Sequence, residues 1–231
     1  MGTPATLAAK RATTTIPILM ASTGDPVLTG IVASLSRPGG NITGYSTAGS
    51  ELNAKRLGLM RELLPRLQRV GLLERSTNPY YRAVRLGFEQ ACQSLGLQPI
   101  IVEVASVGEL EKAIAEMARR QAQALFVQDD TLFFDNRIPM MSAALRYALP
   151  TIGARIDMLE AGALVSYGPT DAEQGQRYAA FVDRILRGAK PADLPIEQPT
   201  QFKLGINLRT ARALGITVPQ ALLHRADEII R

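Results

Sequence analysis

The chain is poor in the residues that most catalytic mechanisms require. Its 231 residues include one histidine, one cysteine and no tryptophan. Nucleophilic catalysis usually pairs a serine, cysteine or threonine with a base, most often histidine. His224 lies in an amphipathic stretch (219–231) whose pattern predicts a surface position, and the helical spacing of Cys92 from Phe88 and Leu95 predicts a small buried hydrophobe. The positions predicted for His224 and Cys92 therefore disfavour an enzyme that uses nucleophilic catalysis.

Nucleotide-binding and metal-binding motifs are also absent. The sequence contains no Gly-x4-Gly-Lys-Ser/Thr phosphate loop, no Gly-x-Gly-x-x-Gly fingerprint and no Gly-x-Ser-x-Gly elbow. Only carboxylates are available in number as metal ligands, whereas transition-metal sites usually combine several His, Cys and carboxylate side chains. We therefore expect no catalytic residue, no metal and no cofactor.

Long hydrophobic runs and a secretory signal are missing as well. The apolar stretches 99–102 and 122–127 are far shorter than the roughly 20 residues that span a bilayer. Residues 1–11 lack the order of basic region, apolar run and cleavage site of a signal peptide, so the chain as written would stay in the cytoplasm. The net charge of +5 comes from basic residues interleaved with acidic ones, which predicts a solvated surface and leaves nucleic-acid binding as the lesser alternative.

What the sequence does contain is an alternation of short β-branched runs with longer segments of helical period. This alternation is typical of βα units around parallel sheets and predicts an α/β fold. Strands are expected at 16–21, 42–45, 69–74, 98–105, 122–128, 150–153, 163–167 and 202–207. Helices are expected at 27–35, 52–64, 80–95, 107–120, 132–147, 172–187 and 209–214.

Polar turns follow several of these strands, and parallel strands place such turns at the one sheet edge where open α/β sheets bind ligands. The first turn holds Ser22, Thr23 and Asp25, with Asp25 and Pro26 in position to begin a helix. Its hydroxyls and backbone N–H groups suit an anion such as a carboxylate, and a plain helix cap is the alternative. The other candidate ligand-binding residues are Ser76, Thr77, Asn78, Asp129, Asp130, Arg155 and Tyr167.

Each charged candidate has two interpretations. Asp129 and Asp130 either cap a helix and pair with arginine, or receive a ligand ammonium group. If the ligand is an amino acid, we expect Asp130 to be the ammonium anchor, with Asp129 as the competing candidate because a one-residue shift at the strand end exchanges the two. Arg155 either clamps a carboxylate or forms a structural ion pair. With six Tyr, six Phe and no Trp, a sugar site that depends on aromatic stacking is disfavoured.

Long motifs of this chain resemble the extracytoplasmic substrate-binding proteins of ABC importers, in the branch with tryptophan-binding, phenylalanine-binding and many uncharacterised members. The resemblance covers essentially the whole chain and is strongest at 14–18, 22–27, 36–44 (Ser-Arg-Pro-Gly-Gly-Asn-Ile-Thr-Gly), 161–169, 188–200 and 207–215. It implies a periplasmic-binding-protein type I fold, in which two Rossmann-like lobes with parallel sheets close over a small ligand. It also implies an ABC permease as partner and a periplasmic or membrane-anchored extracytoplasmic location.

The resemblance further implies an N-terminally truncated first lobe. Residues 1–65 and 161–190 are assigned to lobe one, and residues 66–160 and 191–231 to lobe two. Unpaired strand edges in the incomplete lobe predict a possible homodimer.

The leading interpretation is thus a solute-binding protein for a small polar ligand such as an amino acid. A sensory or regulatory ligand-binding domain of the same fold is the alternative, and an α/β enzyme using Asp129, Asp130 and Arg155 is a more distant one.

Overall fold

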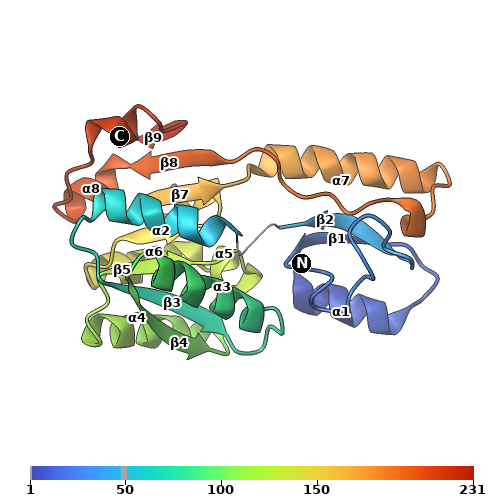
Figure 1. Cartoon of the computed structure of the whole chain (residues 1–231), viewed down its shortest axis with the longest axis horizontal. Coiled ribbons are helices and arrows are strands. Elements are labelled where there is room, and N and C mark those ends of the chain that lie inside the picture. Colours follow the sequence, from blue (N-terminus) through green and yellow to red (C-terminus); the bar gives the residue numbers. More distant parts are fainter. Residues whose placement is uncertain (1, 48–50) are drawn as a thin grey trace.

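The chain folds into two α/β units that lie end to end, a larger one and a smaller one (Figure 1). The computed structural model describes residues 2–47 and 51–231, without the side chains of Ser22, Glu51, Asp171 and Glu173. The chain passes from the smaller unit to the larger one, returns to the smaller unit for α7 (Asp171–Leu186) and residues 194–197, and ends in the larger unit (Figure 1).

The larger unit is built around a seven-stranded sheet with the order β4-β3-β5-β6-β7-β8-β9. All neighbouring strands pair in parallel except β7 and β8, which are antiparallel. The strands are β3 (Arg69–Arg75), β4 (Gln98–Val104), β5 (Ala124–Val127), β6 (Thr151–Gly153), β7 (Val165–Gly168), β8 (Lys203–Asn207) and β9 (Glu228–Ile230). Its helices are α2 (Glu51–Leu63), α3 (Tyr81–Ser94), α4 (Leu110–Arg119), α5 (Thr131–Asp135), α6 (Arg137–Arg146), α8 (Leu208–Ala213) and α9 (Gln220–Leu223).

The central strands are apolar on both sides because helices cover both faces of the sheet. Along β5, Ala124 and Phe126 belong to the core with α2, α3 and α8, whereas Leu125 and Val127 belong to the core with α4, α5 and α6. Successive residues of a strand point to opposite faces, so one four-residue strand contributes to two cores. Cys92, on α3, is fully buried in the first of these cores, as its helical spacing predicts.

The smaller unit contains a two-stranded parallel sheet of β1 (Ile18–Thr23) and β2 (Ile42–Ser46), packed with α1 (Thr3–Ala12) and α7 (Asp171–Leu186). Residues 194–197 return to this unit and lie beside β2, where the Ser46 N–H donates to the Glu197 carbonyl at 2.9 Å and the Thr43 hydroxyl donates to the Leu194 carbonyl at 2.8 Å. A small core of Met20, Ile31, Val32, Ile42 and Ile196 holds the unit together.

Local structure departs from the sequence-based prediction in four segments. Residues 27–35 form turns and no helix, because Gly30 adopts a positive φ of 67° that interrupts helical hydrogen bonding. The expected helix 132–147 is divided into α5 and α6 near Asn136, just before Pro139, which supplies no backbone N–H. The C-terminal amphipathic stretch is the short α9 followed by β9, and α1 was not expected. His224 is exposed, as predicted.

The packing also differs from the expected division into lobes. Helix α2, expected in lobe one, buries Leu57, Met60 and Leu63 in a core of the larger unit. Strand β7, also expected in lobe one, pairs with β6 and β8 in the seven-stranded sheet. β7 fits the larger unit because it fills the place between β6 and β8 in the sheet. α2 fits there because its apolar side chains cover one face of that sheet.

We expect Phe126→Ala to lower the free energy of unfolding by about 3–5 kcal/mol, because it leaves a cavity in the central strand of the sheet. Phe126 is fully buried and its ring lies 5.2 Å from that of Phe88. Urea unfolding followed by circular dichroism measures the change. Leu186→Ala is the control, since Leu186 is 82% exposed, and its effect should stay within about 0.5 kcal/mol. Equal effects of the two substitutions would contradict this core assignment.

Candidate functional site

The polar turns of both units meet where the carboxyl ends of β3, β5 and β6 face the smaller unit. A cavity of about 110 Å³ lies there. The smaller unit contributes Gly2 and Thr3 at the beginning of α1. The larger unit contributes Asn78, Tyr80, Asp129, Asp130, Thr131, Phe134, Asp135 and Arg155. Of the residues that the sequence proposed, the fold thus brings Asn78, Asp129, Asp130 and Arg155 to one cavity.

Asp130 has the geometry of a structural residue. One carboxylate oxygen accepts hydrogen bonds from the Leu132 N–H at 2.7 Å, which caps α5, and from Arg75 at 3.2 Å. The other oxygen accepts from Asn78 Nδ2 at 2.8 Å. The side chain is only 3% exposed, so these three donors replace the water that the carboxylate loses on burial. The capping interpretation of Asp130 therefore matches the structure.

Asp129, the next residue toward β5, is placed differently. Its carboxylate is 16% exposed and lies 3.8 Å from Arg155 Nη1, which is an ion-pair distance but too long for a hydrogen bond. Burial raises the pKa of Asp129 above its ordinary value, and the positive charges of Arg155 and Arg56 oppose that shift. Asp129 is thus a carboxylate in the cavity wall whose negative charge is only partly compensated by nearby arginines.

Arg155 forms a structural ion-pair cluster and stacks on an aromatic ring. Its guanidinium lies 3.4 Å from Asp157 as well as 3.8 Å from Asp129, and its Cζ lies 4.1 Å from the centre of the Phe134 ring. The Cζ atom of Arg137 lies 4.4 Å from the centre of the same Phe134 ring, so the ring is in contact with two cations. The ion-pair interpretation of Arg155 is the one that the geometry matches.

Arg56, on α2, was not identified from the sequence. It is 3% exposed and its guanidinium donates to the carbonyls of Tyr167 at 2.8 Å and Ala154 at 3.2 Å, which binds α2 to the ends of β7 and β6. Burial lowers the pKa of Arg56 to about 10, although the negative charge of Asp129 opposes the shift. An arginine inside a helix carries no local signal for such a position, because the position depends on which strand ends α2 crosses.

Tyr80 was likewise missed. Its backbone N–H donates to Asn78 Oδ1 at 3.1 Å, and its ring lies against Gly24 of the smaller unit. Burial raises the pKa of the Tyr80 hydroxyl to about 12, and a backbone hydrogen bond with Asp25 opposes the shift. The sequence marks Tyr80 only as the residue before a helix, and contact with Gly24 requires the tertiary fold.

The remaining proposed residues do not line this cavity. Ser76 and Thr77 are exposed, and the Thr77 hydroxyl accepts from Arg75 at 3.1 Å. Asp25 is exposed and its carboxylate accepts from the backbone N–H groups of Val27 and Leu28, as a cap does. The side chain of Ser22 lies outside the described part of the structure. The two other positions are Thr23, which is buried with its hydroxyl 3.0 Å from that of Thr6, and Tyr167, whose ring stacks on Phe202.

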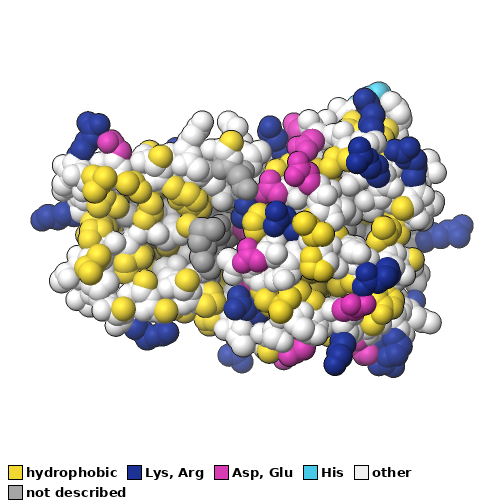
Figure 2. Space-filling model, turned by 180° about the vertical axis from the view of Figure 1, so that it is seen from behind, with side chains coloured by type: hydrophobic (Ala, Val, Ile, Leu, Met, Phe, Trp, Pro, Cys, Tyr) yellow, Lys and Arg dark blue, Asp and Glu magenta, His cyan; other side chains and the backbone are white. Residues whose placement is uncertain are grey.

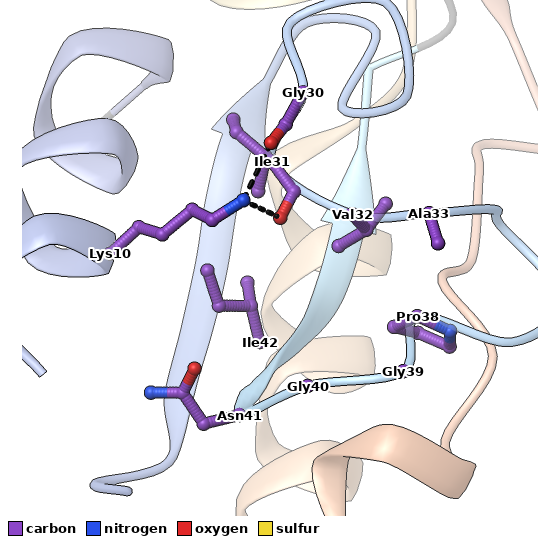
Figure 3. Close-up of a pocket in the computed structure, with 10 residues that line it drawn as sticks. All are labelled: Lys10, Gly30, Ile31, Val32, Ala33, Pro38, Gly39, Gly40, Asn41 and Ile42. Atoms are coloured by element: carbon purple, nitrogen blue, oxygen red, sulfur yellow. Dashed lines mark hydrogen bonds between the residues drawn. The ribbon is translucent and has the colours of Figure 1, made fainter. Parts of the chain in front are cut away.

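A larger cavity, of about 350 Å³, lies at the opposite ends of β1 and β2 (Figure 3). The exposed Lys10 points into it from α1, and its Nζ donates to the carbonyls of Gly30 at 2.6 Å and Ile31 at 3.0 Å. The rest of the lining consists of a glycine-rich turn, Asn41 and small apolar side chains. This cavity therefore offers little charge for recognising a polar ligand, in contrast to the cavity between the units.

No helix within residues 2–47 and 51–231 has the length and apolar character needed to cross a membrane. Within the same ranges, 2–47 and 51–231, no three histidine, cysteine or carboxylate side chains gather as a metal site would require.

Comparison with known proteins identifies the family. A family model described as ABC transporter substrate binding protein matches residues 1–230. The chain belongs to this family. It is a family of substrate-binding proteins and not of catalysts, and the match confirms the resemblance seen in the sequence motifs.

Individual relatives agree with this assignment. A tyrosine-binding protein of Clostridioides difficile is 25% identical over 94% of this chain, which spans 62% of that protein's length. A crystal structure of an ABC domain in complex with L-Trp, from Streptococcus pneumonia, is 28% identical and matches 99% of this chain and 77% of its own with a TM-score of 0.92. A conserved domain protein from Vibrio cholerae is 27% identical, with 99% and 76% covered and a TM-score of 0.93. The predicted periplasmic-binding-protein type I fold is thereby confirmed.

We expect Asp130→Asn to destabilise the protein by about 1–3 kcal/mol, because the new amide loses the ion pair with Arg75 and opposes the amide of Asn78. Asp129→Asn should leave the stability at neutral pH unchanged or raise it. Its folded-state pKa lies above the ordinary value, so the ionised form opposes folding and protonation relieves that cost as the pH falls. Unfolding of both variants and the unsubstituted chain from pH 7.5 to pH 4 measures this. A larger loss of stability for Asp129→Asn than for Asp130→Asn would contradict the two roles.

Proposed function

We propose that the chain captures an α-amino acid between its two units, which act as the lobes of a substrate-binding protein, and releases it chemically unchanged. The observation that carries the proposal is the partly compensated Asp129 carboxylate in a cavity lined by both units. Two relatives support the ligand class, since one is a tyrosine-binding protein and another was crystallised with L-Trp. In this proposal residues 2–47 and 169–199 form lobe one, and residues 51–168 and 200–231 form lobe two.

The charges of the cavity support a ligand that carries a positive group. Asp129 and Asp135 are both in its wall, and the ammonium group of an amino acid would complete the partial compensation of Asp129. The beginning of α1, with Gly2 and Thr3, is the contribution of the smaller unit, and the positive end of a helix favours a negative group such as a carboxylate. We therefore assign the ammonium contact to Asp129, in place of Asp130.

The wider role follows from the family. We propose that the ligand is passed to an ABC permease, and that the protein acts outside the cytoplasmic membrane. The proposal involves no cofactor and no nucleic acid. The matched family and the similar structure in complex with L-Trp support it.

Isothermal titration calorimetry with L-tryptophan, L-tyrosine, L-phenylalanine and small L-amino acids tests the proposal. We expect at least one to bind, and Asp129→Asn to weaken that binding by about 1.5–3 kcal/mol, the range for a hydrogen bond to a charged group. Because burial keeps the pKa of Asp129 above that of an ordinary aspartate, affinity should decline on acidification before exposed aspartates titrate.

Asp130→Asn is the matched control for this experiment, because it removes the neighbouring carboxylate, which Arg75 and Asn78 already compensate, and leaves Asp129 in place. The Asp130→Asn variant should bind the amino acid with unchanged affinity under conditions in which the variant remains folded. Absence of binding to every amino acid would reject the proposed function. Normal binding by Asp129→Asn would reject only the ammonium contact.

We also propose that the chain self-associates through the smaller unit. That unit has only two strands and exposes Ile16, Leu28 and Leu186, and Figure 2 shows hydrophobic side chains gathered over it. Contiguous exposed apolar surface and short open sheets favour association. Light scattering after gel filtration at several concentrations should show a dimer, and Leu28→Glu should weaken it. A monomer at every concentration would contradict this expectation.

A further inference from the structure

The two units touch directly at Tyr80 and Gly24. A Cβ atom built on Gly24 would lie 2.2 Å from Tyr80 Cδ1, 2.3 Å from Cε1 and 2.5 Å from Cγ, so the tyrosine ring occupies the space that any other residue would need. Tyr80 stands just before α3 of the larger unit, and Gly24 follows β1 of the smaller unit. The ring packs on the backbone of a different lobe only because position 24 has no side chain.

The Tyr80 ring is held rigidly on the larger unit. Its backbone N–H donates to Asn78 Oδ1 at 3.1 Å, and Asn78 Nδ2 donates to Asp130 Oδ2 at 2.8 Å. Asp130 is itself fixed by Arg75 and by the cap of α5. The contact with Gly24 includes Cγ, which lies near the base of the side chain, so the ring cannot avoid a new Cβ by a small movement of its tip.

The same contact is polar at the other end of the ring. The backbone of Asp25, the residue after Gly24, lies near the Tyr80 hydroxyl and opposes the rise that burial causes in its pKa. The ring thus packs on the end of one strand while its hydroxyl lies beside the turn that follows that strand. Tyr80 and the Gly24–Asp25 turn belong to different units and lie on segments far apart in the chain.

We propose that the Tyr80–Gly24 contact is the closure contact of the two lobes, and that it sets how much of the ligand-free protein is closed. Tyr80 is then a positioning residue for ligand binding, since Asp129 and the beginning of α1 line one cavity only while the lobes are together. Ligand affinity falls in proportion to the closed fraction, so weakening this contact weakens binding. Because Tyr80 lines the cavity and Gly24 does not, Gly24→Ala weakens the contact without altering a cavity-lining side chain. The effect on affinity rests on the function proposed above, whereas the effect on closure does not.

The experiment is a double-mutant cycle on the distance between the lobes, measured by electron-spin spectroscopy without ligand. Spin labels on Leu186→Cys and Ile138→Cys report the distance, because these positions are 82% and 66% exposed and lie on different units. The native Cys92 is fully buried and stays unlabelled. Tyr80→Ala and Gly24→Ala should each shift the population toward longer distances.

The combination of the two substitutions is the decisive variant. Gly24→Ala acts through a clash with the ring, so it should have no further effect once Tyr80→Ala has removed that ring, and the double variant should equal Tyr80→Ala. Tyr80→Phe, which keeps the packing and loses the hydroxyl, should lie between the unsubstituted chain and Tyr80→Ala. Gly175→Ala is the matched glycine control, because a Cβ there would meet no atom within 4 Å, and it should change nothing.

Calorimetry then tests the link to binding, with L-tyrosine and L-tryptophan as probes. We expect Gly24→Ala, which leaves every cavity-lining side chain in place, to weaken binding roughly tenfold, the size of a moderate shift in a two-state equilibrium. Unchanged distances in both single variants, or additive opening in the double variant, would overturn the closure contact. If the distances shift as expected and neither amino acid binds the unsubstituted chain, the closure contact stands and the proposed function fails. If binding occurs and Gly24→Ala does not weaken it, the contact does not set affinity.

Discussion

The parallel pairing of β3, β5, β6 and β7 is the constraint on which the rest of the structure depends. Because these strands run in one direction, the segments that follow them all emerge at one edge of the sheet. The smaller unit stands against that edge, so its own strand ends meet them. A cavity with polar walls between the units is a consequence of strand direction, before any individual side chain is considered.

Burial then gives neighbouring residues of the same type different properties. Asp130 is surrounded by three donors and contributes to the structure. Asp129 is the adjacent residue, and successive side chains of an extended chain point to opposite sides. Its carboxylate lies in the cavity wall, 3.8 Å from Arg155. The negative charge of Asp130 is balanced by donors of the larger unit, whereas that of Asp129 is only partly balanced. This difference separates two carboxylates that the sequence alone treats alike.

The buried arginines at this edge serve the fold first. Arg56 donates to carbonyls at the ends of β6 and β7 and so joins α2 to the sheet. Arg155 balances Asp129 and Asp157 while it covers the Phe134 ring. Arg56 and Arg155 thus hold together segments of the larger unit, and the beginning of α1 in the smaller unit faces this edge across the cavity.

The sequence by itself determined the α/β class, the ends of most strands within about two residues, and the family, because these depend on local alternation of apolar residues and on long motifs. It also identified Asn78, Asp129, Asp130 and Arg155, since polar residues directly after strands carry a local signal. Tertiary structure alone decided which of the two carboxylates is fully hydrogen-bonded, that α2 and β7 pack with the larger unit, that Tyr80 lines the cavity, and that Arg56 holds α2 to the ends of β6 and β7. Those outcomes depend on contacts between segments far apart in the chain, and the periodicity of a single segment holds no information about its distant partner.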